Sequence, residues 1–183
     1  MKNQQALSLD KPPALRIPDS HAIMSDFTHL DENQQPHMVD VGDKTVTRRT
    51  ARAEATVNLT PEVMKRFDRG DIQSKKGPVF HTAIIAGIQA AKKTSDLIPL
   101  CHPLPITKCS VTIDPIDDSR VVVRAEVVTD AKTGVEMEAL CAASGAALTL
   151  YDMCKAVTKG IVIVNIRLVE KTGGKSDFHT NAR

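Results

Sequence analysis

Aromatic residues are scarce in this chain, which has no tryptophan and an aromatic content of only 3%. The hydrophobic core must therefore be built from aliphatic side chains. The chain has few of the aromatic side chains that stack on bases when a protein binds single-stranded nucleic acid. The net charge of +2 over 183 residues is too small to favour duplex binding. These shortages argue against a nucleic-acid-binding protein.

Long apolar runs are also missing. No stretch approaches the ~20 apolar residues that a membrane-spanning helix needs. The N-terminus has no continuous hydrophobic region of the kind that directs export. The four cysteines show no C-x-x-C spacing, and we expect them to be reduced thiols. The sequence thus predicts a cytoplasmic protein that has no membrane segment.

The composition that is present, 42% hydrophobic and 25% charged residues, is typical of a globular protein with one core. The first 30 residues contain prolines 12, 13 and 18 and little periodicity. We expect residues 1–30 to be a disordered N-terminal extension, residues 31–178 to form a single catalytic domain, and residues 179–183 to be a tail.

Hydrophobic periodicity predicts the order β, α, α, β, β, α, β. Alternation over 50–60 predicts a half-buried strand, and Thr60 and Pro61 predict a helix that has Thr60 as N-cap and ends near Gly70. The remaining elements are a helix over 79–94, an irregular segment over 97–105, a hairpin over 106–114 and 120–129, a long helix within 134–160 and a strand over 161–169. This order predicts an α+β, ferredoxin-like fold with helices on one face of an antiparallel sheet.

We also make predictions for the last strand and for the sheet face that the helices leave uncovered. Val162, Val164, Ile166 and Leu168 should point one way, and residues 172–176 should be a flexible, Gly-rich tail. The helix-free face should be apolar enough to favour association of subunits, with Val122 and Val128 among its residues.

The segment from Gly134 to Gly160 is informative because it places charged residues in an otherwise small and apolar helix. Asp152 and Lys155 stand three residues apart and therefore share one helix face. Two interpretations stay open. One is a partly exposed ion pair near the helix end, where lysines suit the helix dipole. The other is an acid and a base at the wall of a pocket.

Basic residues recur where the chain is expected to turn. They are Lys76, Lys155, Lys171 and Lys175, with Arg48 and Arg52 upstream. Together they would suit a polyphosphate substrate, although single lysines are usually solvated. A P-loop is excluded, because the motif would need glycine where Val169 stands.

Cys101 and His102 fall in the proline-framed segment 97–105. Neighbouring Cys and His could indicate zinc, but no second pair stands at ligand spacing, so no metal site is predicted. His102 is either a buried histidine that hydrogen-bonds a loop or a contact to a ligand.

Several longer motifs appear in order: MVDV (38–41), ARAEA (51–55), IAGIQAAK (85–92), DLIPLCHPL (96–104), TGVEMEAL (133–140), LYDMCKAV (150–157) and KTGGKS (171–176). Over roughly residues 37–178 the chain resembles the cyclic pyranopterin monophosphate synthase family, the C protein of molybdenum-cofactor biosynthesis. The resemblance implies a lyase. Its substrate would be 3′,8-cyclo-7,8-dihydro-GTP, made by a radical-SAM GTP cyclase, and its products cyclic pyranopterin monophosphate and pyrophosphate.

The resemblance also implies residue roles. Asp152 is implied as a catalytic acid, with Lys155 and Lys76 as catalytic lysines. The resemblance also implies substrate contacts for His102, Glu136, Glu138 and Lys171. From their residue types and places in the sequence we further expect contacts from Cys101, Lys175, Arg48 and Arg52. Many relatives have glycine after the serine of GGKS, whereas Asp177 follows here, so the contacts of this tail are open. The implied assembly is a homohexamer, a trimer of dimers with sites at subunit interfaces. No cofactor is required, although Mg²⁺ could accompany the phosphates.

Two other classes of function remain. A small-ligand sensor with this fold could bind a nucleotide through the same lysines, because fold alone does not fix activity. It would have no need for an acid beside Lys155. A GTP ring-opening hydrolase would need water activated by zinc, and the metal ligands are missing from the sequence.

Overall fold

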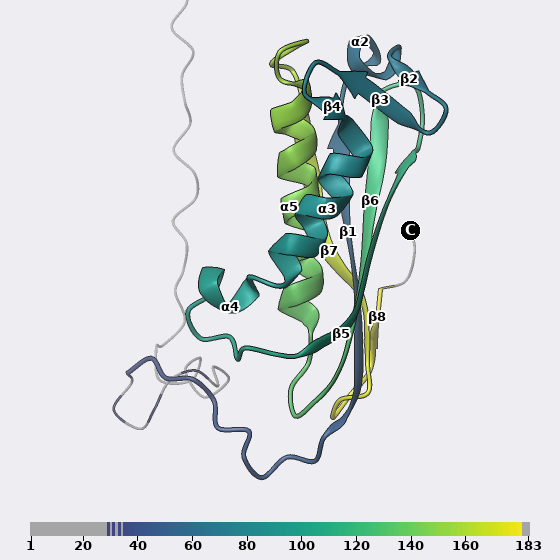
Figure 1. Ribbon diagram of the computed structural model, residues 1–183. Coiled ribbons are helices and arrows are strands. Elements are labelled where there is room, and N and C mark those ends of the chain that lie inside the picture. The colour runs from purple at the N-terminus through teal and green to yellow at the C-terminus, as the bar shows by residue number, and fades with distance from the viewer. Residues whose placement is uncertain (1–28, 30, 32, 34, 181–183) are drawn as a thin grey trace, which may run out of the picture. The chain divides into compact units, whose positions relative to one another are not determined.

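A computed structural model of the chain describes residues 29, 31, 33 and 35–180 (Figure 1). The described residues divide into two units, one that ends at His37 and one that begins at Met38. In the first unit, the Asp31 carboxylate accepts hydrogen bonds of 2.8 Å from the backbone N–H groups of Asn33 and Gln35. The expected extension over 1–30 lies almost entirely outside the described residues, as do residues 181–183.

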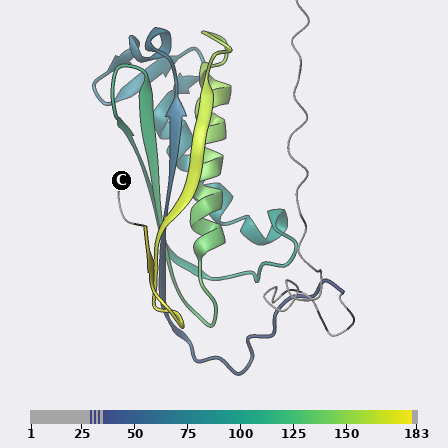
Figure 2. The same cartoon turned by 180° about the vertical axis from the view of Figure 1, so that it is seen from behind.

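The second unit is built on a five-stranded antiparallel sheet with the order β5-β6-β1-β7-β8. Its strands are β1 (Thr47–Asn58), β5 (Ile106–Pro115), β6 (Arg120–Ala131), β7 (Val162–Thr172) and β8 (Phe178–His179). Helices α3 (Val79–Ala91) and α5 (Glu136–Cys154) lie side by side on one face of this sheet (Figures 1 and 2). The order β1, α3, β5, β6, α5, β7 is the split β-α-β pattern, so the predicted α+β, ferredoxin-like fold is confirmed.

Small residues let the helices approach the sheet and each other. The face of β1 beneath the helices consists of Ala51, Ala53, Ala55 and Val57, all buried. Where the helices cross, a Cβ on Gly87 would lie 2.8 Å from the carbonyl oxygen of Ala142, and one on Gly145 would lie 2.6 Å from the Cβ of Ala90. The helices therefore meet almost backbone to backbone.

The predicted helix begins where expected, with Pro61 as its first residue, but it does not reach Gly70. Helix α2 (Pro61–Met64) has only four residues. Thr60 is its N-cap residue, as predicted, but it has a φ of 73° and a buried hydroxyl that makes no capping hydrogen bond. The chain instead forms a three-stranded sheet of β2 (Phe67–Asp68), β3 (Asp71–Ser74) and β4 (Gly77–Pro78). Arg69 and Gly70 both have positive φ, as the loop of a type I′ hairpin requires. Gly70 thus belongs to a hairpin loop and not to a helix end.

Strand β7 departs from the expected alternation. Two register shifts against β1 place Ile163, Ile166 and Leu168 opposite Val57, Ala55 and Ala53 on the helix side. Each shift inserts a residue and so moves later side chains to the other face. Val162 and Val164 are exposed as a result, whereas Ile163 and Leu168 pack against the core.

Residues 172–176 do not form a tail. They contain the turn that joins β7 to β8, and β8 pairs with β7 through Glu170 and Lys171. This short strand was not predicted, because two residues carry no periodic signal.

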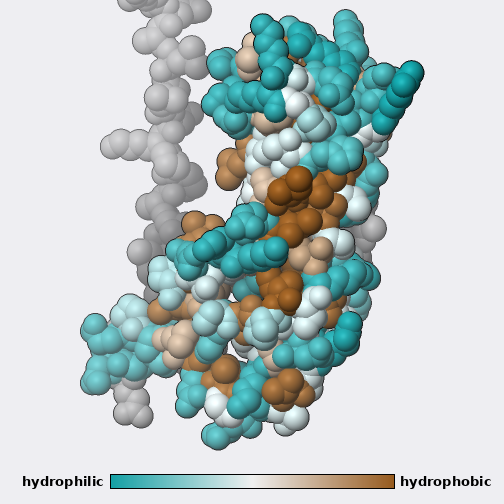
Figure 3. Space-filling model, in the orientation of Figure 1, coloured by the Kyte–Doolittle hydropathy of each residue, from teal (hydrophilic) through white to brown (hydrophobic). Residues whose placement is uncertain are grey.

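The helix-free face of the sheet is less apolar than expected. Val122 and Val128 are 6% and 4% exposed, and Arg52, Glu54, Arg124 and Glu126 occupy the rows between them. Apolar side chains remain visible on the helix side, along α3 and beside β5 (Figure 3), where Ile85 is 68% exposed. No helix in the described part of the chain could cross a membrane.

Candidate active site

The first group of predicted site residues meets at the C-terminal end of α5. The Asp152 carboxylate binds Lys155 Nζ through Oδ1 at 2.6 Å and Lys76 Nζ through Oδ2 at 2.9 Å. Lys76 Nζ also donates to the backbone carbonyl of Asp152 at 3.4 Å. Lys76 comes from the turn between β3 and β4, so the structure unites the three residues that the sequence assigned to catalysis. We name them the lysine cluster.

The lysine cluster is charged at neutral pH. Hydrogen bonds from Lys155 and then Lys76, together with their positive charges, lower the pKa of Asp152 to about 2. The same contact with Asp152 raises the pKa of Lys155. All three side chains are about half exposed, so a substrate can reach them. In this state the ammonium groups are the proton donors and the carboxylate is the acceptor.

A basic pocket of about 520 Å³ lies near the N-terminal end of α5, a volume in the usual range for small-molecule sites. Its charged lining residues are Lys44, Arg49, Lys132, Lys171, Lys175 and Glu136. Lys171 Nζ lies 3.2 Å from Glu136 Oε1. Five cations against one carboxylate suit a polyanionic ligand.

The turn after β7 forms one wall of the basic pocket. Gly173 has a φ of +84°, and a side chain there would collide with the carbonyl oxygen of Arg48, so only glycine fits. Thr47 donates its hydroxyl to the Gly173 carbonyl at 2.7 Å. Asp177 accepts the Gly173 N–H at 3.1 Å. Asp177, the departure from the motif of the relatives, therefore closes the turn that carries Lys175.

Cys101 and His102 lie with Glu138 against the first turns of α5. His102 and Glu138 line a small cavity of about 70 Å³. Glu138 is 4% exposed, and burial, followed by the nearby charge of Glu136, raises its pKa. Burial and the Glu138 charge raise the pKa of the Cys101 thiol as well. This loop is therefore part of the packing around the pocket end of α5.

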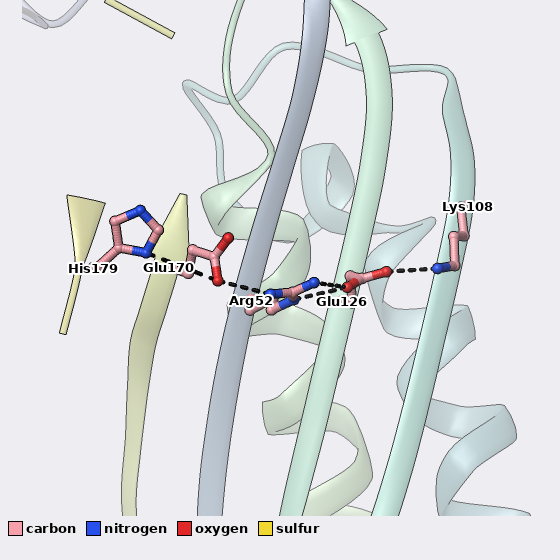
Figure 4. A network of polar contacts seen from close by, with 5 residues as sticks. All are labelled: Arg52, Lys108, Glu126, Glu170 and His179. Atoms are coloured by element: carbon pink, nitrogen blue, oxygen red, sulfur yellow. Dashed lines mark hydrogen bonds and ion pairs between the residues drawn. The ribbon is translucent and has the colours of Figure 1, made fainter. Parts of the chain in front are cut away.

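Arg48 and Arg52 are not brought to the basic pocket. The Arg48 side chain is 69% exposed and lies 3.9 Å from Asp130. Arg52 lies on the helix-free face, where it bridges Glu126 at 2.7 Å and Glu170 at 2.8 Å. Figure 4 shows this row, which continues to Lys108 and His179.

Arg49 is the arginine of this stretch that lines the pocket, and the sequence reasoning missed it. Its guanidinium also donates to the carbonyl oxygens of Ala131 at 3.4 Å and Lys132 at 3.5 Å. The alternation of side chains along a strand could have identified it. Arg49 lies on the same face of β1 as Ala51, toward the helices, whereas Arg48 and Arg52 lie on the other face.

The lysine cluster and the basic pocket lie at opposite ends of α5. From Glu136 to Asp152 the helix rises by about 24 Å, at 1.5 Å per residue. One chain therefore does not gather all predicted site residues at one point. Among the residues that the structure describes, no group of three or more His, Cys, Asp or Glu could hold a metal ion.

The fold and these groups define an α+β protein with two candidate functional surfaces, one the lysine cluster and the other the basic pocket. The chain belongs to the MoaC family, whose sequence model matches residues 38–174. It is also 53% identical over 156 residues to the molybdenum cofactor biosynthesis bifunctional protein of a Synechocystis species. That match covers 82% of this chain and 45% of the relative, so the chain spans less than half of the relative's length.

Proposed function

We propose that the protein is a lyase of molybdenum-cofactor biosynthesis that converts 3′,8-cyclo-7,8-dihydro-GTP into cyclic pyranopterin monophosphate and releases pyrophosphate. Membership of the MoaC family supports the pathway, and the Synechocystis relative carries molybdenum-cofactor biosynthesis in its name. The observation that carries the reaction is the lysine cluster, in which Asp152 binds Lys76 and Lys155 within 2.9 Å.

The proposed reaction needs proton transfers and a stabilised leaving group. Opening the five-membered purine ring and building the pterin move protons between nitrogen, carbon and oxygen atoms. Closing the cyclic phosphate joins a sugar hydroxyl oxygen to the α-phosphorus, sends the hydroxyl proton to a base and breaks the bond to pyrophosphate. Ammonium groups and a carboxylate in one cluster supply both an acid and a base.

We assign the acid to the lysines and not to Asp152. A carboxyl group with a pKa of about 2 is almost fully ionised at neutral pH and is a poor proton donor there. Lys155 and Lys76 are ammonium groups that can donate, and Asp152 accepts a proton or holds the two lysines in place. This reverses the role that the resemblance implied for Asp152.

The basic pocket would hold the triphosphate. Its lysines and Arg49 neutralise phosphate charge, and the same contacts would stabilise the departing pyrophosphate. Mg²⁺, where present, would enter with the phosphates, since this ion binds substrate phosphates and keeps several waters. His102 and Glu138 would contact the ring system from the neighbouring cavity.

A complete site would then combine two subunits. The separation of about 24 Å along α5 is explained if the basic pocket of one subunit faces the lysine cluster of another. We therefore propose a homo-oligomer, and the resemblance points to a hexamer arranged as a trimer of dimers. A radical-SAM GTP cyclase would supply the substrate in the cytoplasm.

The test is to incubate the purified chain with 3′,8-cyclo-7,8-dihydro-GTP and to measure pyrophosphate, with the pterin product followed by mass spectrometry. We expect one pyrophosphate per product. GTP serves as the control substrate, because release of formate from GTP would indicate a ring-opening hydrolase. Tight binding of the cyclised nucleotide without turnover would indicate a sensor and overturn the proposal.

A further inference from the structure

Asp71, the first residue of β3, is a buried carboxylate that the proposed chemistry does not use. It is 4% exposed. Its Oδ1 accepts the backbone N–H groups of Ile72 at 2.6 Å and Phe80 at 2.7 Å. Its Oδ2 accepts the N–H of His81 at 3.1 Å and lies 2.5 Å from His81 Nδ1. Burial raises the pKa of Asp71, but the hydrogen bonds from His81, Phe80 and Ile72 outweigh it and lower the pKa below its ordinary value.

These partners join two ends of one hairpin. Asp71 begins β3, and Phe80 and His81 lie in the first turn of α3, directly after β4. Backbone N–H groups in a first helical turn have no partner within the helix. Lys76 lies between the two ends, in the turn of the hairpin. The Asp71 carboxylate therefore ties the base of the hairpin to α3.

The tip of the hairpin is fixed separately. The Ser74 hydroxyl donates to the Gly77 carbonyl at 2.9 Å and accepts the Lys76 N–H at 3.1 Å. Gly77 has a φ of +110°, a conformation that residues with side chains rarely adopt. Hydrogen bonds at its base and its tip thus restrain the hairpin that carries Lys76 relative to α3. Helix α3 packs directly on α5, which carries Asp152.

A fixed hairpin matters because the ion pair that it presents is exposed. The Lys76 and Asp152 side chains are 54% and 53% exposed, and surface ion pairs gain little against the entropy of a long side chain. We propose that Asp71 is a positioning residue of the lysine cluster, which sets the place of Lys76 against Asp152 through the hairpin, with Ser74 holding the turn. The effect of Asp71 on turnover rests on the proposed function, whereas its effect on the ion pair between Lys76 and Asp152 can be measured without substrate.

The test follows the Asp152 carboxyl carbon by NMR during pH titration of folded variants. Lys76→Ala is the reference variant, because it removes the whole Lys76 contribution and should raise the Asp152 pKa while the larger Lys155 contribution remains. Asp71→Asn replaces one carboxylate oxygen by an amide NH₂ group, which cannot accept the backbone hydrogen bonds that Asp71 accepts. Ser74→Ala removes the hydroxyl that bonds to Gly77 and Lys76 in the turn. We expect each to reproduce most of the Lys76→Ala shift. Asp68→Asn makes the same change at an exposed carboxylate in β2, whose ion pair is with Arg69 at 3.8 Å, and should leave Asp152 unchanged.

Kinetics provide the second measurement. We expect kcat to fall by roughly 10- to 100-fold with KM nearly unchanged, since displaced catalytic groups cost rate more than binding. If Asp152 titrates as in the parent protein in both folded variants, the positioning role is overturned, whatever their stability. If Asp71→Asn does not fold, Ser74→Ala decides the question. Shifted titration in a protein that never releases pyrophosphate would refute the proposed function and leave the positioning role intact.

Discussion

At the scale of single residues, Asp152 shows how charge state follows from geometry. Its pKa is lowered from 3.8 to about 2, so the ion pairs with Lys155 and Lys76 stabilise the fold at pH values above the unfolded pKa. That contribution is lost as the pH falls through about 2. Because the side chain is exposed, the pairs contribute little to stability. The carboxylate is therefore ionised throughout the neutral range, where we propose a chemical role for it.

We predict that Asp152→Asn slows single-turnover pyrophosphate release by roughly 10²-fold or more, the scale of general acid–base catalysis. The ratio of parent to variant rates should stay constant from about pH 5 to pH 9, because the parent carboxyl does not titrate there. Substrate affinity should change much less. The loss should not add to that of Lys155→Ala in the double variant, since the two act as a unit. Near-normal rates for Asp152→Asn would show that Asp152 only forms surface ion pairs and takes no part in catalysis.

A matched pair of arginine variants tests the basic pocket. Arg49 lines the pocket and should contact phosphate, so Arg49→Ala should raise KM by roughly 10-fold or more. Arg48→Ala changes the neighbouring residue, whose exposed side chain lies near Asp130, and the sequence reasoning assigned it to the substrate. Steady-state kinetics of both variants decide between the two residues. A larger effect at Arg48 would mean that the geometry of a single chain misplaces the phosphate contact.

At Glu138, a change that stabilises the fold should also reduce turnover. Burial raises its pKa, so ionisation costs stability as the pH rises from the unfolded pKa to the folded one. We predict that Glu138→Gln raises Tm at pH 8 and changes it less at pH 4, where the parent carboxyl is already largely protonated. Turnover should fall if Glu138 contacts the substrate. Thermal unfolding at both pH values measures the first effect, and an equal or lower Tm at pH 8 would contradict it.

At the scale of elements, the contact between α3 and α5 rests on two glycines. Gly145→Ala would place a methyl group 2.6 Å from the Cβ of Ala90, and overpacking of this kind costs about 1–3 kcal/mol. The gain in helix propensity, about 1 kcal/mol, offsets part of this. We predict a net loss of stability, measured as a lower urea midpoint at constant m-value. Gln89→Ala, at an exposed position of α3, is the control and should change the midpoint little.

Elements with a clear period were predictable from the sequence, and those set by local backbone geometry were not. The alternation of β1 and the apolar pattern of α5 gave both elements to within a few residues. The β2–β3 hairpin was missed because its signal, Gly70, also suits a helix end. The bulges of β7 were missed because register depends on the partner strand.

The same limit applies to the candidate site. Asp152 and Lys155 follow from helix spacing alone, because residues three apart share a face. The approach of Lys76, 76 positions earlier in the chain, could not be derived from spacing, because it depends on the hairpin tied to α3. Only the family resemblance placed Lys76 there. Arg49 could have been found by strand parity, since every second residue of β1 faces the helices.

At the scale of the whole molecule, our proposal requires a second subunit to bring the lysine cluster and the basic pocket together. We predict that light scattering at micromolar concentration shows a hexamer. The apolar side chains left on the helix side, Ile85 among them, are surface that such an assembly could cover. A monodisperse monomer with full activity would rule out a shared site.

Mixing of inactive subunits tests the shared site itself. Asp152→Asn damages the lysine cluster only, and the double variant Arg49→Ala/Lys171→Ala damages the basic pocket only. If each site combines one surface from each of two subunits, co-refolded equal mixtures regain activity, because some sites receive both intact surfaces. Random pairing in a two-fold symmetric dimer leaves about a quarter of the sites intact, so activity should reach about a quarter of the parent value.

The control for this experiment mixes two variants with damage at the same end, Asp152→Asn and Lys155→Ala, which cannot complement because every shared site then lacks one cluster residue. If a site lay within one chain, mixing Asp152→Asn with the pocket variant would give no more activity than the sum of the two alone. Failure to complement would mean one of two things. Either one substrate spans the length of α5, about 24 Å, or one of the two surfaces takes no part in the reaction. Recovery in the first mixture and not in the second would show that α5 serves two different sites, one at each of its ends.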